Sequence, residues 1–340
     1  MKTNFVRKAD VTDEIIRQAA ETIKNGGLVA FPTETVYGLG ANGLNDAAVT
    51  AVYNAKGRPA DNPLILHISS LEMLKLIAKD ISPIAKVLMS AFWPGPLTLV
   101  LKKTGLVSDS ISRGLDTVAV RFPAHELAQK LISAADTPIA APSANVSGRP
   151  SPTEALHVLE DMDGKIPWIL DGGSCDIGVE STVVDVTGEY PIILRPGKIT
   201  FEDIKKLFPD TEYDEHLVAE HGEIVAPRSP GMKYKHYAPK GEIEILSGDI
   251  LDVQKYIDKH TVKMSAVLTF NQYPIKHKNI YSLGNIHKPE QVCAKLFSYL
   301  RTFDTLGIEK IFAVMPEKTG IGFALYNRLL KAAGGKVIDL

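Results

Sequence analysis

Apolar residues along the chain follow two kinds of spacing, one typical of helices and the other typical of strands. Spacings of three and four residues predict helices at 13–24, 46–55, 71–79 and 81–92. Short apolar runs predict strands at LVAF, PLILHI, LTLVLKK, TVAVRFP, PIAA, STVVDV and PIILR. The first part of the chain therefore predicts an α/β domain.

Beyond Gly241 strand and helix patterns alternate more simply. Strand patterns occur at EIEIL, SAVLTF, NIYSL, KIFAVMP and KVIDL, and helical patterns occur at 250–260, 289–304 and 320–333. Strands separated by helices of this length predict a small domain with a parallel sheet. Because this part shows no Gly-rich phosphate loop and no catalytic cluster, we interpret it as an accessory domain.

A change in composition separates the two parts. Residues 201–223 are acidic and lose apolar periodicity after Phe208, and the Pro- and Gly-rich stretch APRSPGMKYKHYAPKG follows. The predicted organisation is a catalytic domain at 1–215, a linker at 216–240 and an accessory domain at 241–340. The linker has side chains able to cover a nucleotide, namely Arg228, Lys233, Tyr234, Lys235, His236, Tyr237 and Lys240. A solvated tether is the alternative.

Composition limits the possible classes of protein. The net charge of −2 argues against broad electrostatic coating of nucleic acid, although it leaves room for a local basic cleft. No signal peptide and no apolar run of about 18 residues is evident, so we expect a cytoplasmic protein without membrane contact. The two cysteines, Cys175 and Cys293, match no metal or redox spacing and are expected to be buried thiols.

The stretch KGRPADNPLILHI places two cations in one turn. Lys56 and Arg58 follow a predicted helix, and an apolar strand begins directly after them. A Lys supplies a compact charge and an Arg supplies a planar fork, and together they suit a polyanion. A solvated basic turn is the alternative for the pair taken alone.

Polar residues also stand at the ends of several predicted strands. They are Thr35, Arg121, Ser143, Ser181 and Arg195. Polar groups at the ends of apolar strands predict one shared cleft, as in open α/β sheets. After Ser143, the segment 152–159 would start a helix whose N-terminus favours anions. For that loop alone, the spacing of the residues favours an ordinary turn.

The segment FPTETVYGLGANG contains a formal dinucleotide fingerprint at Gly38, Gly40 and Gly43, with Asp61 downstream. We reject a Rossmann site here, because the first Gly does not follow directly on a strand. The glycines instead predict close approach of a small ligand, or a turn. The hydroxyls of Thr33 and Thr35 can hold a polar ligand without adding charge.

Taken together and in this order, the motifs resemble a known family. PTETVYGLG, KGRPADNPLILHI, VAVRFP, APSANVSG, ESTVVD, LRPG and SPGMKYKHYAP are similar to the long, two-domain form of the YrdC-type L-threonylcarbamoyladenylate synthases. The catalytic domain of that family would cover about residues 9–200. Its KxR…SxN signature is present as Lys56, Arg58, Ser143 and Asn145.

The resemblance implies a fold and a reaction. The fold would be a twisted, open, mixed sheet with helices around a concave cleft, followed by a smaller Rossmann-like domain with a parallel sheet. The reaction would join L-threonine, bicarbonate or CO₂, and ATP into threonylcarbamoyl-AMP and pyrophosphate, the first step of threonylcarbamoyladenosine formation at position 37 of tRNA. Positive charge must then bring two anions together, which suits Lys56, Arg58 and Mg²⁺ held mainly by the ATP phosphates.

The resemblance also implies residue roles. Lys56 and Arg58 would be catalytic. L-Threonine would be held by Thr35, His67, Arg121 and Ser181. ATP would be held by Arg58, Asn62, Thr117, Ser143, Asn145, Ser151, Arg195 and, from the linker acting as a lid, Tyr234.

Two other functions remain as alternatives. The cleft could grip double-stranded RNA without chemistry, although the near-neutral composition argues against this. The scaffold could instead carbamoylate another acceptor, as the related domain of hydrogenase-maturation proteins does. For the synthase, the expected partners are the small substrates and a separate tRNA threonylcarbamoyl transferase complex, with at most a weak contact with RNA.

Overall fold

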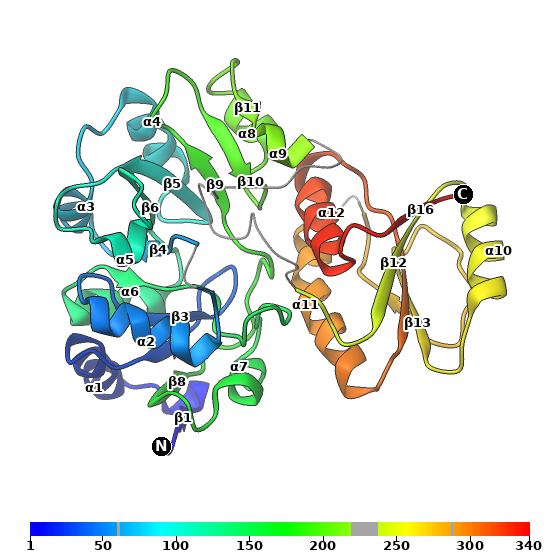
Figure 1. Ribbon diagram of the computed structural model, residues 1–340, viewed down its shortest axis with the longest axis horizontal. Coiled ribbons are helices and arrows are strands. Elements are labelled where there is room, and N and C mark those ends of the chain that lie inside the picture. The colour runs from blue at the N-terminus through cyan, green and yellow to red at the C-terminus, as the bar shows by residue number, and fades with distance from the viewer. Residues whose placement is uncertain (60–61, 219–236, 287–288) are drawn as a thin grey trace. The chain divides into compact units, whose positions relative to one another are not determined.

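The computed structural model describes most of the chain, namely residues 1–59, 62–218, 237–286 and 289–340. The described chain forms two compact units, which Figure 1 draws as ribbons. Most of the predicted linker, with Arg228, Lys233, Tyr234, Lys235 and His236, lies outside the described residues, and so does Asp61.

The first unit takes in Met1–Ser147, Pro152–Cys175 and, of the described residues that follow, 180–218. Its strands are β1 (Asn4–Val6), β2 (Val29–Phe31), β3 (Gly38–Asn42), β4 (Ile65–His67), β5 (Leu97–Lys102), β6 (Thr117–Arg121), β7 (Ile139–Ala140), β8 (Trp168–Leu170), β9 (Thr182–Asp185), β10 (Ile192–Arg195) and β11 (Glu212–Tyr213). Its helices are η1 (Lys8–Asp10), α1 (Asp13–Lys24), α2 (Asp46–Lys56), α3 (Leu71–Ile77), α4 (Pro83–Phe92), α5 (Asp109–Ser112), α6 (Glu126–Ala135), α7 (Ala155–Met162), α8 (Phe201–Lys205) and α9 (Glu215–Val218).

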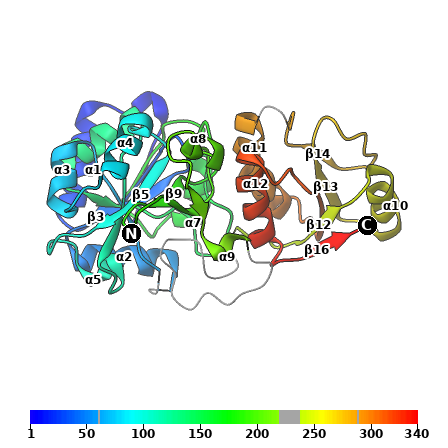
Figure 2. The ribbon, with the colours of Figure 1, turned by 90° about the horizontal axis from the view of Figure 1, so that it is seen from above.

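The strands of this unit form one mixed sheet in the order β1-β8-β2-β3-β7-β4-β6-β5-β9-β10-β11. The prediction of a mixed sheet is confirmed. Because successive side chains of a strand point to opposite faces, Val29 and Phe31 pack with α1 and α6, whereas Ala30 packs with α2 and α7. Figure 2 shows α1, α3 and α4 on one side of this sheet and α2 on the other.

The strands β4, β6, β5, β9 and β10 differ in how their two faces are covered. One face joins the large core that includes the helices α1, α3, α4 and α6. On the other face, the buried cluster consists of strand residues alone, namely Ile65, Val100, Ala119, Val183 and Leu194. That second face is therefore where polar side chains from the ends of these strands can gather.

The second unit contains Gly148–Ser151, Asp176–Val179 and the C-terminal part of the chain through Leu340. Its elements are β12 (Glu242–Ser247), α10 (Ile250–His260), β13 (Ser265–Thr269), β14 (Ile280–Ser282), α11 (Pro289–Thr305), β15 (Lys310–Val314), α12 (Gly320–Ala332) and β16 (Val337–Asp339). The strand order is β14-β13-β15-β12-β16, and every pairing is parallel, which confirms the predicted sheet. In Figure 1, α10 lies on one side of this sheet and α11 and α12 on the other.

Two sequence predictions about local structure are wrong. Gly38 and Gly40 lie in strand β3 rather than in a turn, and a Cβ atom on Gly40 would come within 2.7 Å of Phe31 and 2.9 Å of Ile139. The helix expected at 152–159 begins only at Ala155, because the carbonyls of Pro152 and Thr153 accept hydrogen bonds from the backbone N–H groups of Tyr37 and Cys175.

The helix bounds of two further elements shift slightly. α3 ends at Ile77 rather than at Lys79, whose N–H donates to the carbonyl of Lys102, and α4 begins at Pro83 behind its Ser82 cap. Cys175 and Cys293 are buried free thiols, as predicted. Within the described ranges, no helix has both the length and the apolar character needed to cross a membrane.

Candidate active site

Strand direction brings five polar residues to one edge of the large sheet. β4 and β6 are parallel, β5 is antiparallel to β6, β9 is parallel to β5, and β10 is antiparallel to β9. The carboxyl ends of β4, β6 and β10 therefore lie beside the amino ends of β5 and β9. The residues at these ends are His67, Arg121, Arg195, Thr98 and Ser181.

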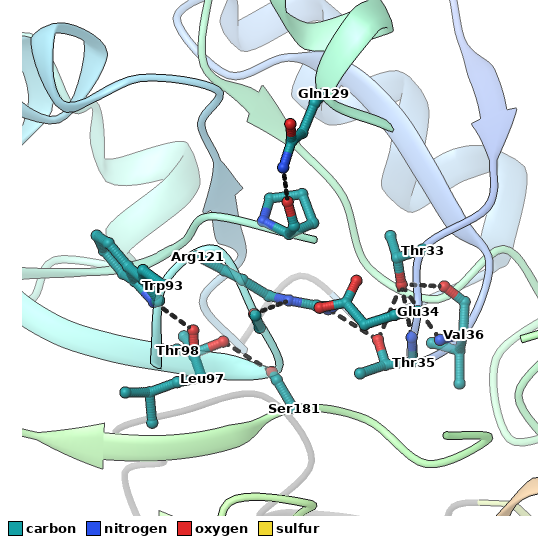
Figure 3. A network of polar contacts seen from close by, with 12 residues as sticks. Thr33, Glu34, Thr35, Val36, Trp93, Leu97, Thr98, Arg121, Gln129 and Ser181 are labelled. Atoms are coloured by element: carbon teal, nitrogen blue, oxygen red, sulfur yellow. Dashed lines mark hydrogen bonds and ion pairs between the residues drawn. The ribbon is translucent and has the colours of Figure 1, made fainter. Parts of the chain in front are cut away.

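Arg121 is held by contacts with three residues (Figure 3). It is 4% exposed, its Nη1 donates to Thr35 Oγ1 at 2.8 Å, and its Nε donates to the Gly95 carbonyl at 3.4 Å. Its Nη2 forms an ion pair with Glu34 Oε1 at 2.8 Å. The segment around Thr35 thus fixes the guanidinium at the end of β6.

The residue order Thr33, Glu34, Thr35 explains this arrangement. The Thr33 hydroxyl donates to the Val36 carbonyl at 2.7 Å and lies 2.9 Å from Thr35 Oγ1, which holds the turn in shape. Of the two hydroxyls expected to hold a ligand, Thr33 therefore supports the turn and Thr35 contacts Arg121. Sequence reasoning missed Glu34, although its position between the two threonines was a usable signal.

Ser181 links the neighbouring strands. Its Oγ lies 2.7 Å from Thr98 Oγ1, and it accepts a hydrogen bond from Arg195 Nη2 at 3.1 Å. Arg195 Nε also donates to the Ser181 carbonyl at 3.0 Å. Thr98 was not among the predicted site residues. The available signal was a hydroxyl near the start of an otherwise apolar strand.

His67 lies directly opposite Arg121 in the register of β4 and β6. Its Nδ1 is buried and has no hydrogen-bond partner among the described residues. Burial and the nearby Arg121 charge lower the pKa of His67 to about 3, so the imidazole is neutral at physiological pH. A buried ring nitrogen without a partner is a position that a ligand hydroxyl can satisfy.

Lys56 meets the predicted SxN loop. Helix α2 begins with Asn45, whose side chain accepts from the N–H groups of Ala47 and Ala48, and it ends at Gly57 in the left-handed conformation. Lys56 is thereby directed inward, and its Nζ donates to the Ser143 carbonyl and, at 2.6 Å, to the Asn145 carbonyl. Three of the four signature positions, Lys56, Ser143 and Asn145, therefore meet, in part through main-chain oxygens of the loop.

Three further residues predicted on the nucleotide side lie near the amino ends of β4 and β6. Arg58 Nη2 donates to the Pro63 carbonyl at 3.4 Å, and Tyr53 donates to the Asn62 carbonyl at 3.0 Å. Asn62 Oδ1 is buried without a partner in the described part of the chain. Thr117 is the first residue of β6, at the opposite end of that strand from Arg121.

Ser151 is buried and directly precedes Pro152, whose carbonyl accepts a hydrogen bond from the N–H of Tyr37, and its contact with ATP stays a prediction. Tyr234 lies outside the described residues. The residues that do gather form two sets. Thr35, His67, Arg121, Ser181 and Arg195 lie at one end of the strands, and Arg58, Asn62 and Thr117 lie toward the other.

Comparison with known proteins identifies both parts of the chain. Residues 21–197 match the family model described as Telomere recombination, and residues 199–334 match the model described as Threonylcarbamoyl-AMP synthase, C-terminal domain. The threonylcarbamoyl-AMP synthase of Pyrococcus abyssi is 48% identical over 331 residues, or 96% of each chain. The corresponding protein of Bacillus subtilis is 45% identical over 340 residues, or 97% of each chain.

A solved structure is similar over the same extent. It is the crystal structure of P. abyssi Sua5 complexed with L-threonine, which matches with a TM-score of 0.92 at 45% identity and covers 100% of both chains. Both family models thus match in chain order, and the relatives align from end to end. The chain belongs to the threonylcarbamoyl-AMP synthase family, in its two-domain form.

Proposed function

We propose that this protein makes L-threonylcarbamoyl-AMP and pyrophosphate from L-threonine, bicarbonate or CO₂, and ATP. The relatives are named for that product, and forming an adenylate from ATP is a nucleotidyltransferase reaction. One observation carries the proposal. Arg121 at the end of β6 and Arg195 at the end of β10 lie at the same edge of the sheet, because β6, β5, β9 and β10 pair in that order. One guanidinium suits the amino-acid carboxylate and the other suits a phosphate.

The amino-acid side rests on Arg121. A guanidinium has five N–H donors, and contacts with Gly95, Thr35 and Glu34 engage each of its three nitrogens once. An N–H on each terminal nitrogen remains for a carboxylate held by two parallel bonds. His67 Nδ1, which is buried without a hydrogen-bond partner in the described chain, would meet the threonine hydroxyl. The complex of the P. abyssi relative with L-threonine supports this side of the proposal.

The nucleotide side rests on Arg58 and Arg195, with Asn62 and the loop at Ser143 as uncharged partners. Cations and amides complement phosphate oxygens, and in the described ranges no group of three or more His, Cys, Asp or Glu residues is gathered as for a metal. These residues fit a triphosphate that brings its own Mg²⁺. When bound, Mg²⁺ would neutralise phosphate charge and polarise the phosphorus that is attacked.

The chemistry requires two bond-forming steps. The ammonium group of bound threonine first loses a proton to solvent, and the neutral amine then attacks CO₂ and gives up a second proton to water, which yields a carbamate. A carbamate oxygen then attacks the α-phosphorus of ATP, and the bond from that phosphorus to the bridging oxygen breaks as pyrophosphate leaves. Arg58 would stabilise the meeting of the two anions. Lys56 would contribute its charge while its N–H groups hold the loop carbonyls in place.

We propose that the product passes to a separate transferase complex that modifies tRNA, with at most a weak contact between this protein and RNA. Such a role would place the protein in the cytoplasm. A labile adenylate needs shielding from water before the handover.

Pyrophosphate release tests the proposal. The reaction would contain ATP, Mg²⁺ and bicarbonate, with and without L-threonine, and mass spectrometry would identify the adenylate. We expect release that requires L-threonine and bicarbonate and is lost in Arg58→Ala. Turnover of ATP indifferent to L-threonine would instead favour another acceptor, and RNA binding without turnover would favour the binding module.

A further inference from the structure

The carboxylate of Glu34 lies in the candidate active site and has no role in the reaction described above. Its side chain is 11% exposed and forms the 2.8 Å ion pair with Arg121, as Figure 3 shows. Neither of its oxygens meets a donor in good hydrogen-bond geometry within the described chain. A buried acid is costly unless it is paired, so its presence beside the proposed carboxylate-binding Arg needs a reason.

Glu34 is ionised beside Arg121. Burial alone would raise the pKa of Glu34, but the Arg121 guanidinium, together with the backbone N–H groups of Glu34 and Ala124, more than offsets burial and holds that pKa below its ordinary value. His67, the other titratable group facing Arg121 across the strand pair, is neutral. The charges of Glu34 and Arg121 therefore cancel each other, and the other guanidinium at this sheet edge, Arg195, is the one that the proposed function assigns to the nucleotide.

A balanced pocket discriminates between ligands by their net charge. An α-amino acid enters as a zwitterion and leaves the sum of charges at zero. A carboxylic acid without the amine would add one negative charge that nothing in this pair balances, and burying such a charge is unfavourable. An Arg without its acid would instead favour the simple anion.

We propose that Glu34 is a positioning residue that also determines specificity: it orients the Arg121 fork and balances its charge, so that the pocket accepts a zwitterionic amino acid in preference to the corresponding acid without an amine. The inference rests on the proposed function, because it concerns the L-threonine side of the same site. Glu34 acts through Arg121 and the charge balance, and it takes no part in bond formation.

The first test uses the unmodified protein. Calorimetry would measure the Kd of L-threonine and of 3-hydroxybutanoate with the matching hydroxyl configuration, which keeps the carboxylate and hydroxyl but lacks the amine. We expect 3-hydroxybutanoate to bind at least about tenfold more weakly, a difference of about 1.4 kcal/mol. Equal Kd values for the two ligands would overturn the proposal without the need for any variant.

The second test compares Glu34→Gln with Glu34→Asp, which keeps the charge. In Glu34→Gln the preference for L-threonine should shrink by about tenfold or more, with 3-hydroxybutanoate binding as well as before or better. Glu34→Asp should retain the preference. An unchanged preference in Glu34→Gln, or an equal loss for both ligands, would contradict the specificity role. ATP affinity and a cooperative thermal transition serve as controls for folding.

These outcomes separate the inference from the proposed function. If the unmodified protein bound ATP but not L-threonine, and released no pyrophosphate with it, the proposed function itself would fail. If pyrophosphate release still required L-threonine but L-threonine and 3-hydroxybutanoate bound with equal Kd, only the role proposed for Glu34 would be wrong.

Discussion

Each unit of the chain buries a carboxylate beside a basic side chain, Glu34 in the first unit and Glu244 in the second. The two carboxylates differ in the hydrogen bonds that they accept. Glu244 in β12 of the second unit accepts from Lys336 at 2.7 Å, lies 3.1 Å from Lys310 Nζ, and accepts from Tyr256 at 3.4 Å. Glu34 in the first unit has the ion pair with Arg121, and its oxygens lack hydrogen bonds of good geometry in the described chain.

This difference distinguishes a charge cluster that only stabilises the fold from one that belongs to a ligand-binding site. The Glu244 cluster is complete in itself, because Lys and Tyr donors occupy its oxygens. Across the strand pair from Arg121, the partner of Glu34, His67 Nδ1 has unused hydrogen-bonding capacity in the described chain. A buried polar atom without a hydrogen-bond partner lowers the stability of the fold. A ligand that supplies the missing partner removes this penalty when it binds.

The largest expected effect comes from removing the base from each carboxylate. Arg121→Met leaves Glu34 as a buried charge without its counter-ion, and the free energy of unfolding should fall by about 3–5 kcal/mol. The matched change Lys310→Met leaves Glu244 with Lys336, and a loss of about 1 kcal/mol or less is expected. Urea titration at neutral pH would measure both.

The two units can be followed separately in that titration. Both tryptophans, Trp93 and Trp168, belong to the first unit, so their fluorescence reports its unfolding, while circular dichroism follows the whole chain. Similar losses of unfolding free energy in Arg121→Met and Lys310→Met would show that Glu34 and Glu244 depend equally on their basic partners, against the difference described above.

Lys56 should matter for turnover more than any lysine of the Glu244 cluster. Lys56→Met removes two charge-assisted hydrogen bonds from the loop at Ser143 and Asn145. Since such bonds contribute about 1.5–3 kcal/mol, we expect about a hundredfold loss in kcat/KM for L-threonine-dependent pyrophosphate release. Lys336→Met should leave that rate unchanged. A Lys56→Met enzyme as fast as the parent would rule out the loop-holding role.

His67 should make the stability of the first unit depend on pH. Its folded pKa is about 3 against an ordinary 6.5, so the unfolded chain binds the extra proton first. The stability is complete above pH 6.5 and should fall as the pH drops toward 3, by up to about 1.4 kcal/mol per unit. Tryptophan fluorescence in urea at pH 7, 6 and 5 would measure the slope, which His67→Gln should flatten. An identical slope in that variant would exclude His67 as its source.

The smallest effect concerns two buried threonines on strands. Thr98→Val removes the hydroxyl that contacts Ser181, and the KM for L-threonine should rise about fivefold, equivalent to about 1 kcal/mol. Thr269→Val in the second unit removes a buried hydroxyl without a hydrogen-bond partner in the described chain, and stability should stay the same or increase. Steady-state kinetics and urea titration would check the pair. A destabilising Thr269→Val together with an unchanged KM in Thr98→Val would contradict the assignment of Thr98 to the site.

Most secondary-structure elements could be predicted from the sequence, because amphipathic spacing is a local property of each segment. The helix at 13–24 and the helix at 250–260 have the predicted bounds, and seven strands of the first unit fall within the predicted runs, whereas β1, β3, β8 and β11 were not predicted as strands. The predicted start of one helix was wrong because backbone groups from distant segments bond the carbonyls at 152–153. The predicted turn at Gly40 was wrong because this glycine lies in a strand, where only a residue without a side chain fits against Phe31.

For the candidate site, the sequence by itself determined which residue types stand at the strand ends and placed Lys56 near the SxN motif through the family signature. The tertiary structure decided the rest. Antiparallel pairing sets the start of β5 beside the end of β6, which brings Thr98 into the site, and the turn after β2 places Glu34 against Arg121. These meetings join segments far apart in the chain, so no local spacing encodes them, and they depend on the pairing of strands across the whole sheet.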